Sequence, residues 1–182
     1  MIVLRKLPLA TLFSAAFAVQ AFAAGGLSDT APTQTETTVV CPEGAVYDAS
    51  RQACVIIQDS NLETETLIQN VRELAYFDRL DDARELLNLA AEPEHTMVLT
   101  YQGFTTRRAG DLDTALDFYD RALLADPDNI LARSYMGMAF LLEGNLDLAQ
   151  AQLDEIRNRG GAGTWPETAL LQAIETGVTI NY

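Results

Sequence analysis

The chain has 182 residues, and its 26 acidic residues outnumber its 12 basic ones, for a formal net charge of -14. This length allows one domain with extensions. So acidic a surface repels nucleic acid and anionic lipid headgroups, which excludes both as partners and favours a soluble protein or a basic partner.

The first 23 residues have the three-part form of a secretory signal peptide. Arg5 and Lys6 are basic, residues 7–19 are almost wholly apolar, and the small-x-small pattern of a signal peptidase site ends at Ala23. The apolar run is shorter than the ~20 residues of a membrane-spanning helix, so a retained anchor is the weaker alternative. We expect export to a periplasm or equivalent compartment and cleavage after Ala23. Loss of Arg5 and Lys6 then changes the net charge from -14 to -16, and we expect no membrane span in the mature chain.

Residues 24–40 are rich in Gly, Thr, Ser and Gln and have few large apolar groups. Such a segment buries too little surface to offset its ordering entropy, so we predict a flexible tether.

Residues 41–57 are predicted to form a small hairpin. Val46 and Tyr47 favour a strand, residues 48–51 are a turn candidate, and extended character returns at Cys54. Two cysteines in an oxidising compartment normally pair, so we expect a Cys41–Cys54 disulfide. We expect this hairpin to lie outside the helical region. The variant Cys41→Ser should then leave the melting of the helices almost unchanged.

The Cys-Pro-x-Gly…Tyr-Asp…Cys spacing between residues 41 and 54 resembles half of a chitin-binding module of the peritrophin type. The resemblance covers fifteen residues and lacks the module's other cysteines. Carbohydrate or peptidoglycan binding through the hairpin is therefore an alternative to a purely structural staple.

From Ser60 onward the periodicity is helical. A capping-box pattern starts at Ser60, and apolar residues then recur at three- and four-residue steps. Pro, Gly and Asx residues divide the rest into segments, and we predict seven helices with very short turns, so that successive helices are antiparallel neighbours. The predicted boundaries after the first two helices are 94–109, 111–125, 130–143, 146–159 and 164–177.

Several positions repeat at a spacing of 34 residues. The repeated pairs are Gly103 with Gly137, Gly110 with Gly144, and Ala115 with Ala149. Small residues at this spacing are typical of positions where two helices cross closely, and Gly followed by Asp or Asn is typical of the turns.

This pattern resembles the tetratricopeptide repeat family. The first copy matches at Leu99, Gly103, Ala115, Tyr119 and Pro127, and the second at Met136, Gly137, Phe140, Ala149 and Leu153. Gln102 and Thr106 depart from the first copy, Arg133 and Gly161 depart from the second, and residues 67–90 look like a degenerate copy. The resemblance implies an all-α fold: a short right-handed solenoid of helix hairpins over residues 60–160, closed by a capping helix in 164–182.

No catalytic or metal-binding motif is visible. His95 has no partner at metal-ligand spacing, and the Gly run at 160–163 is not followed by the Lys-Ser/Thr of a phosphate loop. We therefore expect no enzymatic activity, no cofactor and no metal.

The resemblance implies that the first helix of each pair lines a concave face that contacts a protein or peptide. The predicted partner-binding residues there are Arg72, Tyr76, Tyr101, Phe104, Arg107, Arg108 and Met138. The three arginines suggest a local positive patch for an acidic or aromatic-rich segment, unless Glu73 and nearby carboxylates neutralise it. The Lys and Asn set that clamps a peptide's terminal carboxylate in some family members is absent.

Overall fold

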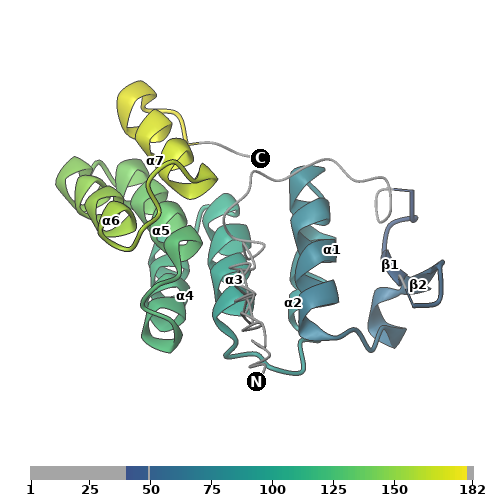
Figure 1. Ribbon diagram of the computed structural model, residues 1–182. Coiled ribbons are helices and arrows are strands. Elements are labelled where there is room, and N and C mark those ends of the chain that lie inside the picture. The colour runs from purple at the N-terminus through teal and green to yellow at the C-terminus, as the bar shows by residue number, and fades with distance from the viewer. Residues whose placement is uncertain (1–39, 49, 180–182) are drawn as a thin grey trace, which may run out of the picture.

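The computed structural model describes residues 40–48 and 50–179. The predicted signal peptide (1–23) and nearly all of the predicted tether (24–40) lie outside this range. Within it two short strands come first and seven α-helices follow, and Figure 1 shows how they are arranged. The elements are β1 (Ala45–Asp48), β2 (Ala53–Ile56), the 3-10 turn η1 (Ile57–Asp59), α1 (Thr64–Tyr76), α2 (Leu80–Leu87), α3 (Thr96–Arg108), α4 (Leu112–Ala125), α5 (Ile130–Leu142), α6 (Leu146–Asn158) and α7 (Trp165–Thr176).

The helices form a row of antiparallel hairpins, which confirms the predicted solenoid of helix pairs. α1 packs on α2, α3 on α4, and α5 on α6, while α4 also packs on α5 and α7 covers α5 and α6. The helices α1, α3, α5 and α7 therefore run in the same direction; we call them the inner helices. No helix within residues 40–179 is both long and apolar enough to cross a membrane.

Two of the repeated glycines stand where helices approach closely. A methyl group added at Gly103 of α3 would come within 2.5 Å of the Tyr119 ring of α4. The same addition at Gly137 of α5 would come within 2.7 Å of the Leu170 side chain of α7. The 34-residue spacing thus marks successive close contacts, and the partner differs between the copies: the second helix of the pair at Gly103, the next pair's first helix at Gly137.

The hairpin is built as the sequence predicts. β1 and β2 are antiparallel, with Tyr47 opposite Cys54, and the Cys41–Cys54 disulfide closes them. At the turn, one carboxylate oxygen of Asp48 accepts from the Ser50 hydroxyl at 2.6 Å and the Ser50 amide at 2.8 Å. These hydrogen bonds lower the pKa of Asp48, and the bond from the Ser50 hydroxyl has the largest effect.

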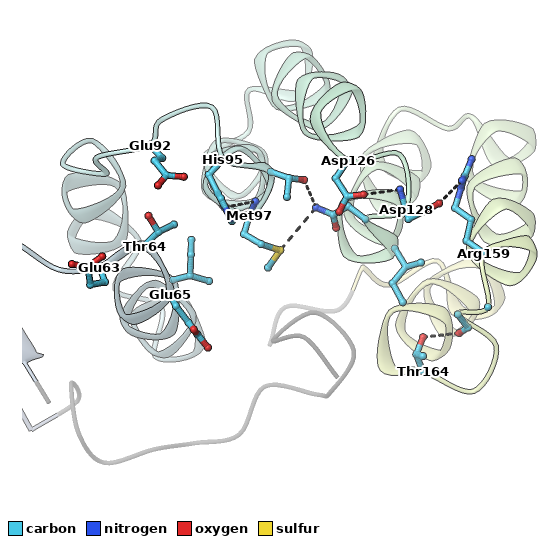
Figure 2. A pocket seen from close by; sticks show the side chains of 16 residues that line it. Glu63, Thr64, Glu65, Glu92, His95, Met97, Asp126, Asp128, Arg159 and Thr164 are labelled. Carbon is cyan, nitrogen blue, oxygen red and sulfur yellow. Dashed lines mark hydrogen bonds and ion pairs between the residues drawn. The ribbon is translucent and has the colours of Figure 1, made fainter. Parts of the chain in front are cut away.

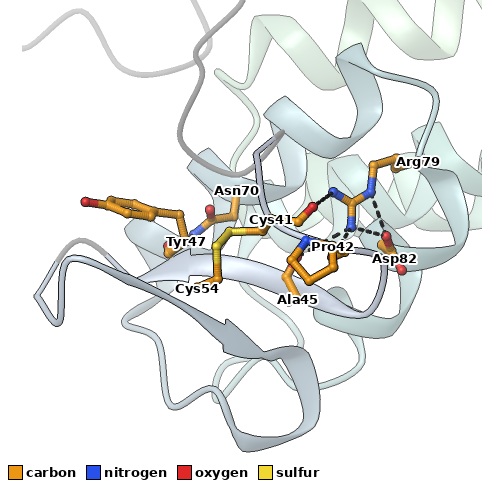
Figure 3. Close-up of a disulfide and its surroundings, with 8 residues drawn as sticks. All are labelled: Cys41, Pro42, Ala45, Tyr47, Cys54, Asn70, Arg79 and Asp82. Atoms are coloured by element: carbon orange, nitrogen blue, oxygen red, sulfur yellow. Dashed lines mark hydrogen bonds and ion pairs between the residues drawn. A yellow bond between two sulfur atoms is a disulfide. The ribbon is translucent and has the colours of Figure 1, made fainter.

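The expectation that the hairpin lies outside the helical array is wrong. Val46 and Ile57 are fully buried in the same core as the helices. The Arg79 guanidinium of the α1–α2 turn donates to the Cys41 carbonyl at 3.2 Å and the Pro42 carbonyl at 3.1 Å, and pairs with Asp82 (Figure 3). The hairpin is thus the cover of the first helix pair.

This packing changes the predicted effect of removing the disulfide. We expect the double variant Cys41→Ser/Cys54→Ser to lose about 3 kcal/mol of unfolding free energy, because the unfolded chain gains freedom while the folded hairpin must stay in place to cover the helices. Helical circular dichroism, followed during urea unfolding, measures the loss. Reductant should destabilise the wild type similarly and the variant not at all; equal midpoints for wild type and variant would show that the helices do not depend on the hairpin.

Candidate functional site

A cleft of about 770 Å³ lies where the four inner helices begin (Figure 2). Its walls come from segments far apart in the sequence, brought together because alternate helices of an antiparallel row start at the same edge. The lining residues are Glu63, Thr64, Glu65 and Ile68 at α1; Glu92, His95, Thr96 and Met97 at α3; Asp126, Asp128, Asn129 and Ile130 at α5; and Arg159, Gly160, Gly161 and Thr164 before α7.

Asn129 fixes the middle of the cleft. Its side-chain oxygen accepts from the Ala132 amide at 2.9 Å and so caps α5. Its side-chain amide donates to the hydroxyls of Thr96 at 2.7 Å and Thr100 at 3.0 Å, both on α3. One buried side chain therefore ends the turn, starts α5 and ties it to α3. The sequence shows Asn129 only as part of a helix break, because its second role depends on a residue 33 positions away.

His95 is the cap of α3. Its Nδ1 accepts from the Met97 amide at 3.3 Å, so this nitrogen carries no proton in this arrangement. Within the described residues no group of three or more His, Cys, Asp or Glu side chains could hold a metal ion.

The rim of the cleft is acidic and its interior partly apolar. Glu63, Glu65 and Glu92 are exposed, whereas Ile68 is buried and Met97 half-buried. The carboxylates suit the positive ends of the inner helices, which favour negative charge in the first turn. The cleft is therefore suited to a segment that offers both apolar and basic groups.

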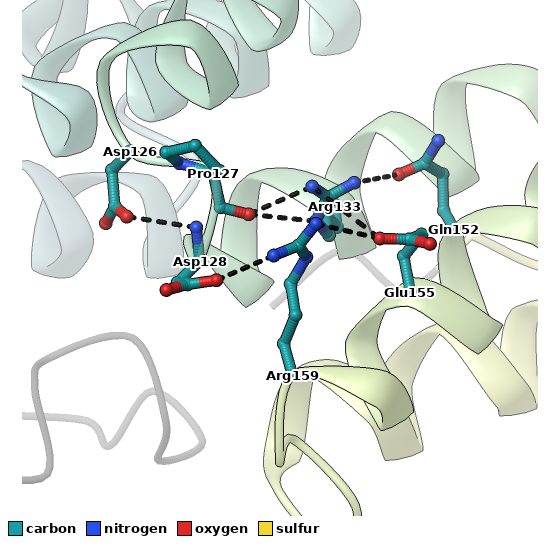
Figure 4. Close-up of polar contacts among 7 residues, drawn as sticks. All are labelled: Asp126, Pro127, Asp128, Arg133, Gln152, Glu155 and Arg159. Carbon is teal, nitrogen blue, oxygen red and sulfur yellow. Dashed lines mark hydrogen bonds and ion pairs between the residues drawn. The ribbon is translucent and has the colours of Figure 1, made fainter.

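One wall of the cleft is held by a network of two arginines (Figure 4). The Arg133 guanidinium donates to the Pro127 carbonyl at 2.9 Å and to Gln152 at 3.2 Å. Arg159 pairs with Asp128 at 2.7 Å and Glu155 at 2.9 Å. Burial lowers the pKa of Arg133, and the nearby Arg159 cation lowers it further. Arg133 stands where the family pattern has Trp, and here it holds the turn before α5 by hydrogen bonds.

The structure divides the seven predicted contact residues into two groups. Tyr101, Phe104 and Met138 are completely buried, and Arg107 is only 3% exposed. A partner can touch these four only if neighbouring groups move away. The aromatic rings instead fill the space between the inner helices, with the Phe104 and Tyr135 ring centroids 5.1 Å apart.

The other three predicted residues, Arg72, Tyr76 and Arg108, are half-buried. Arg108 pairs with Asp78, rather than with the Glu73 that the sequence suggested as a neutralising group. None of the seven lines the cleft. The cleft itself was missed because its residues lie in turns and first helical turns, which a search along helix faces passes over.

The fold and the cleft define a protein built from repeated helix hairpins. Residues 107–173, from the last turn of α3 to the last turn of α7, match the family model of the tetratricopeptide repeat. This part of the chain thus consists of tetratricopeptide repeats, as the resemblance implied, and such repeats are generally non-enzymatic modules for protein–protein interaction. No curated protein and no solved structure matches the chain.

The role assigned to Asn129 can be tested against a second asparagine. Asn145 stands at the equivalent position before α6, but its side chain makes no capping bond. We expect Asn129→Ala to lower the unfolding free energy by about 2 kcal/mol, because it removes a cap and leaves buried threonine hydroxyls without their partner. Asn145→Ala should cost much less. Urea unfolding of both variants measures the difference, and equal losses would contradict the assigned role.

Proposed function

We propose that this chain is an exported, non-enzymatic adaptor that binds a protein or peptide partner along its inner helices, with the cleft at their amino ends as the main contact. One observation carries the proposal: four inner helices from different repeats open onto one cleft. A continuous surface built from several repeats is how repeat arrays hold partners.

The chemistry of the cleft indicates how a partner would be held. Half-buried Met97 offers apolar surface above the buried Ile68 and Ile130, and the exposed carboxylates of Glu65 and Glu92 flank it. Apolar contacts at the centre would supply most of the affinity, while the acidic rim would select basic segments and speed association.

The packing of the hairpin on the helices is enough to account for its presence without a ligand. β1 faces the helices, with Ala45 and Val46 buried, and the disulfide holds it there. Carbohydrate or peptidoglycan binding at the hairpin stays the alternative function. A pull-down on cell-wall sacculi, run beside one on envelope proteins, separates the two.

Export belongs to the same proposal. The basic–apolar–Ala-x-Ala start supports it, and so does a disulfide that contributes to the fold, because such bonds persist in oxidising compartments. We expect N-terminal sequencing of protein taken from cells to show a mature chain that begins at Ala24. Soluble cytoplasmic protein that still carries Met1 would exclude it.

The binding site can be mapped by photo-cross-linking. A photoreactive phenylalanine analogue placed at Met97, inside the cleft, should capture the partner from envelope extract. The same group at Leu124, which is 82% exposed on the outer helix α4, should not. Against the captured partner, Met97→Ala should weaken binding by about 2 kcal/mol, roughly thirtyfold, since it removes apolar contact at the centre. Asp120→Ala on α4 serves as the neutral control. Equal capture from both positions would place the partner elsewhere.

A further inference from the structure

Arg107, in the last turn of α3, is a buried cation whose hydrogen-bonding capacity is not filled. Its side chain is almost entirely covered, and its Nε and Nη2 have no hydrogen-bond partner. None of the ion pairs among the described residues includes it. Buried donors without acceptors are rare in folded proteins, and each requires an explanation.

Aromatic rings surround this cation without satisfying its N–H groups. The guanidinium carbon lies 5.5 Å from the Phe104 ring centroid and 5.9 Å from that of Tyr135. Burial raises the pKa of Tyr119 to about 12, against the opposing positive charge of Arg107. The Tyr119 hydroxyl lies close enough to Arg107 for a weak polar contact that also lowers this pKa, but the contact does not have the geometry of a full hydrogen bond and leaves the hydroxyl, Nε and Nη2 without one. Ring faces attract a cation but accept no directed hydrogen bond of the strength that a carboxylate offers.

A second cation stands beside the first. Arg108 lies 6.0 Å from the same Phe104 ring and is paired with Asp78, whose side chain is 72% exposed. Two guanidinium groups thus share one aromatic ring, and the nearby surface carboxylate of Asp78 pairs with Arg108 alone. The carbonyl end of α3 favours cations at this position, but it leaves Nε and Nη2 of Arg107 without acceptors.

We infer that Arg107 is the receptor for one carboxylate group of a bound ligand, either an acidic side chain of a protein partner or a small organic acid. A planar guanidinium binds a carboxylate through two parallel hydrogen bonds, and the surrounding rings provide a dry site in which those bonds are strong. The site lies in the last turn of α3, whereas the cleft lies at the first turn, so it is separate from the cleft and does not depend on it.

The burial of Arg107 gives the site a spectroscopic reporter. A carboxylate reaches the guanidinium only when neighbouring side chains move apart. Trp165, the only tryptophan in the chain, packs with its ring centroid 6.4 Å from that of Tyr135, which in turn contacts Arg107. Binding should therefore change the fluorescence of Trp165.

The test titrates the purified protein with N-acetyl-triglutamate amide, N-acetyl-triglutamine amide and succinate, followed by tryptophan fluorescence and calorimetry. The triglutamate peptide, succinate or both should bind saturably, and the triglutamine peptide should not. Binding of the peptide alone identifies an acidic side chain as the ligand group, and binding of succinate alone identifies a small acid.

Arg107→Gln should weaken this binding at least tenfold. Arg121→Gln is the matched control, because Arg121 also stacks on a ring, 5.4 Å from the Phe118 centroid, but already pairs with Glu94 and Asp117. If Arg107→Gln does not fold, side-chain Nε–H resonances of wild-type protein give the answer: the Arg107 signal should shift on binding and that of Arg121 should not. No saturable binding of either acid, binding unchanged in Arg107→Gln, or an unmoved Arg107 resonance would each overturn the inference. Success of the cleft mapping would be unaffected by any of these results.

Discussion

The tight turns within the helix pairs determine most of this structure. At Gly110 and Gly144 the backbone takes positive φ values of 91° and 80°, a conformation that residues with a Cβ rarely adopt. In each turn the amide of the third residue after the helix donates to a carbonyl in the last turn of that helix, Asp111 to Thr106 at 3.2 Å and Asn145 to Phe140 at 2.8 Å. The chain therefore reverses within three residues. Alternate helices must then point the same way, which places every inner-helix start at the cleft and the last turn of α3, with Arg107 and Arg108, away from it.

The sequence predicted this repeating architecture well because its signals are local. The turn glycines, the apolar periodicity and the two cysteines each act over a few residues, and the helices begin and end close to the predicted positions: 96–108 against 94–109 for α3, and 146–158 against 146–159 for α6. The capping box at Ser60 is the instructive error. α1 begins at Thr64 after Glu63, and the Ser60 hydroxyl instead bonds to the Ile57 carbonyl at 2.6 Å. The capping-box pattern is present in the sequence, but its serine hydroxyl bonds within the 3-10 turn that follows the hairpin and does not cap α1.

The features that the sequence did not predict depend on distant neighbours. Periodicity identifies the inner side of a helix, but it does not distinguish a side chain that faces an open groove from one that packs on the next helix. Tyr101 and Phe104 are on that side and are buried. The docking of the hairpin rests on Arg79, whose carbonyl partners lie 37 and 38 positions earlier. The sequence likewise does not show which of the short polar residues in the turns lie together in the cleft, because this depends on how the helices pack.

The docked hairpin also affects how copies of such an array can associate. A row of helix hairpins has apolar surface at each end, and an uncovered end is a template on which another array can stack. Val46 and Ile57 occupy that surface on the first pair, and the polar contacts of Arg79 hold them in place. End-to-end stacking at α1 and α2 would require the hairpin to leave. Within the described residues the disulfide-closed hairpin thus does for the first helix pair what a terminal capping repeat does in other arrays: it covers the apolar face on which another unit could stack.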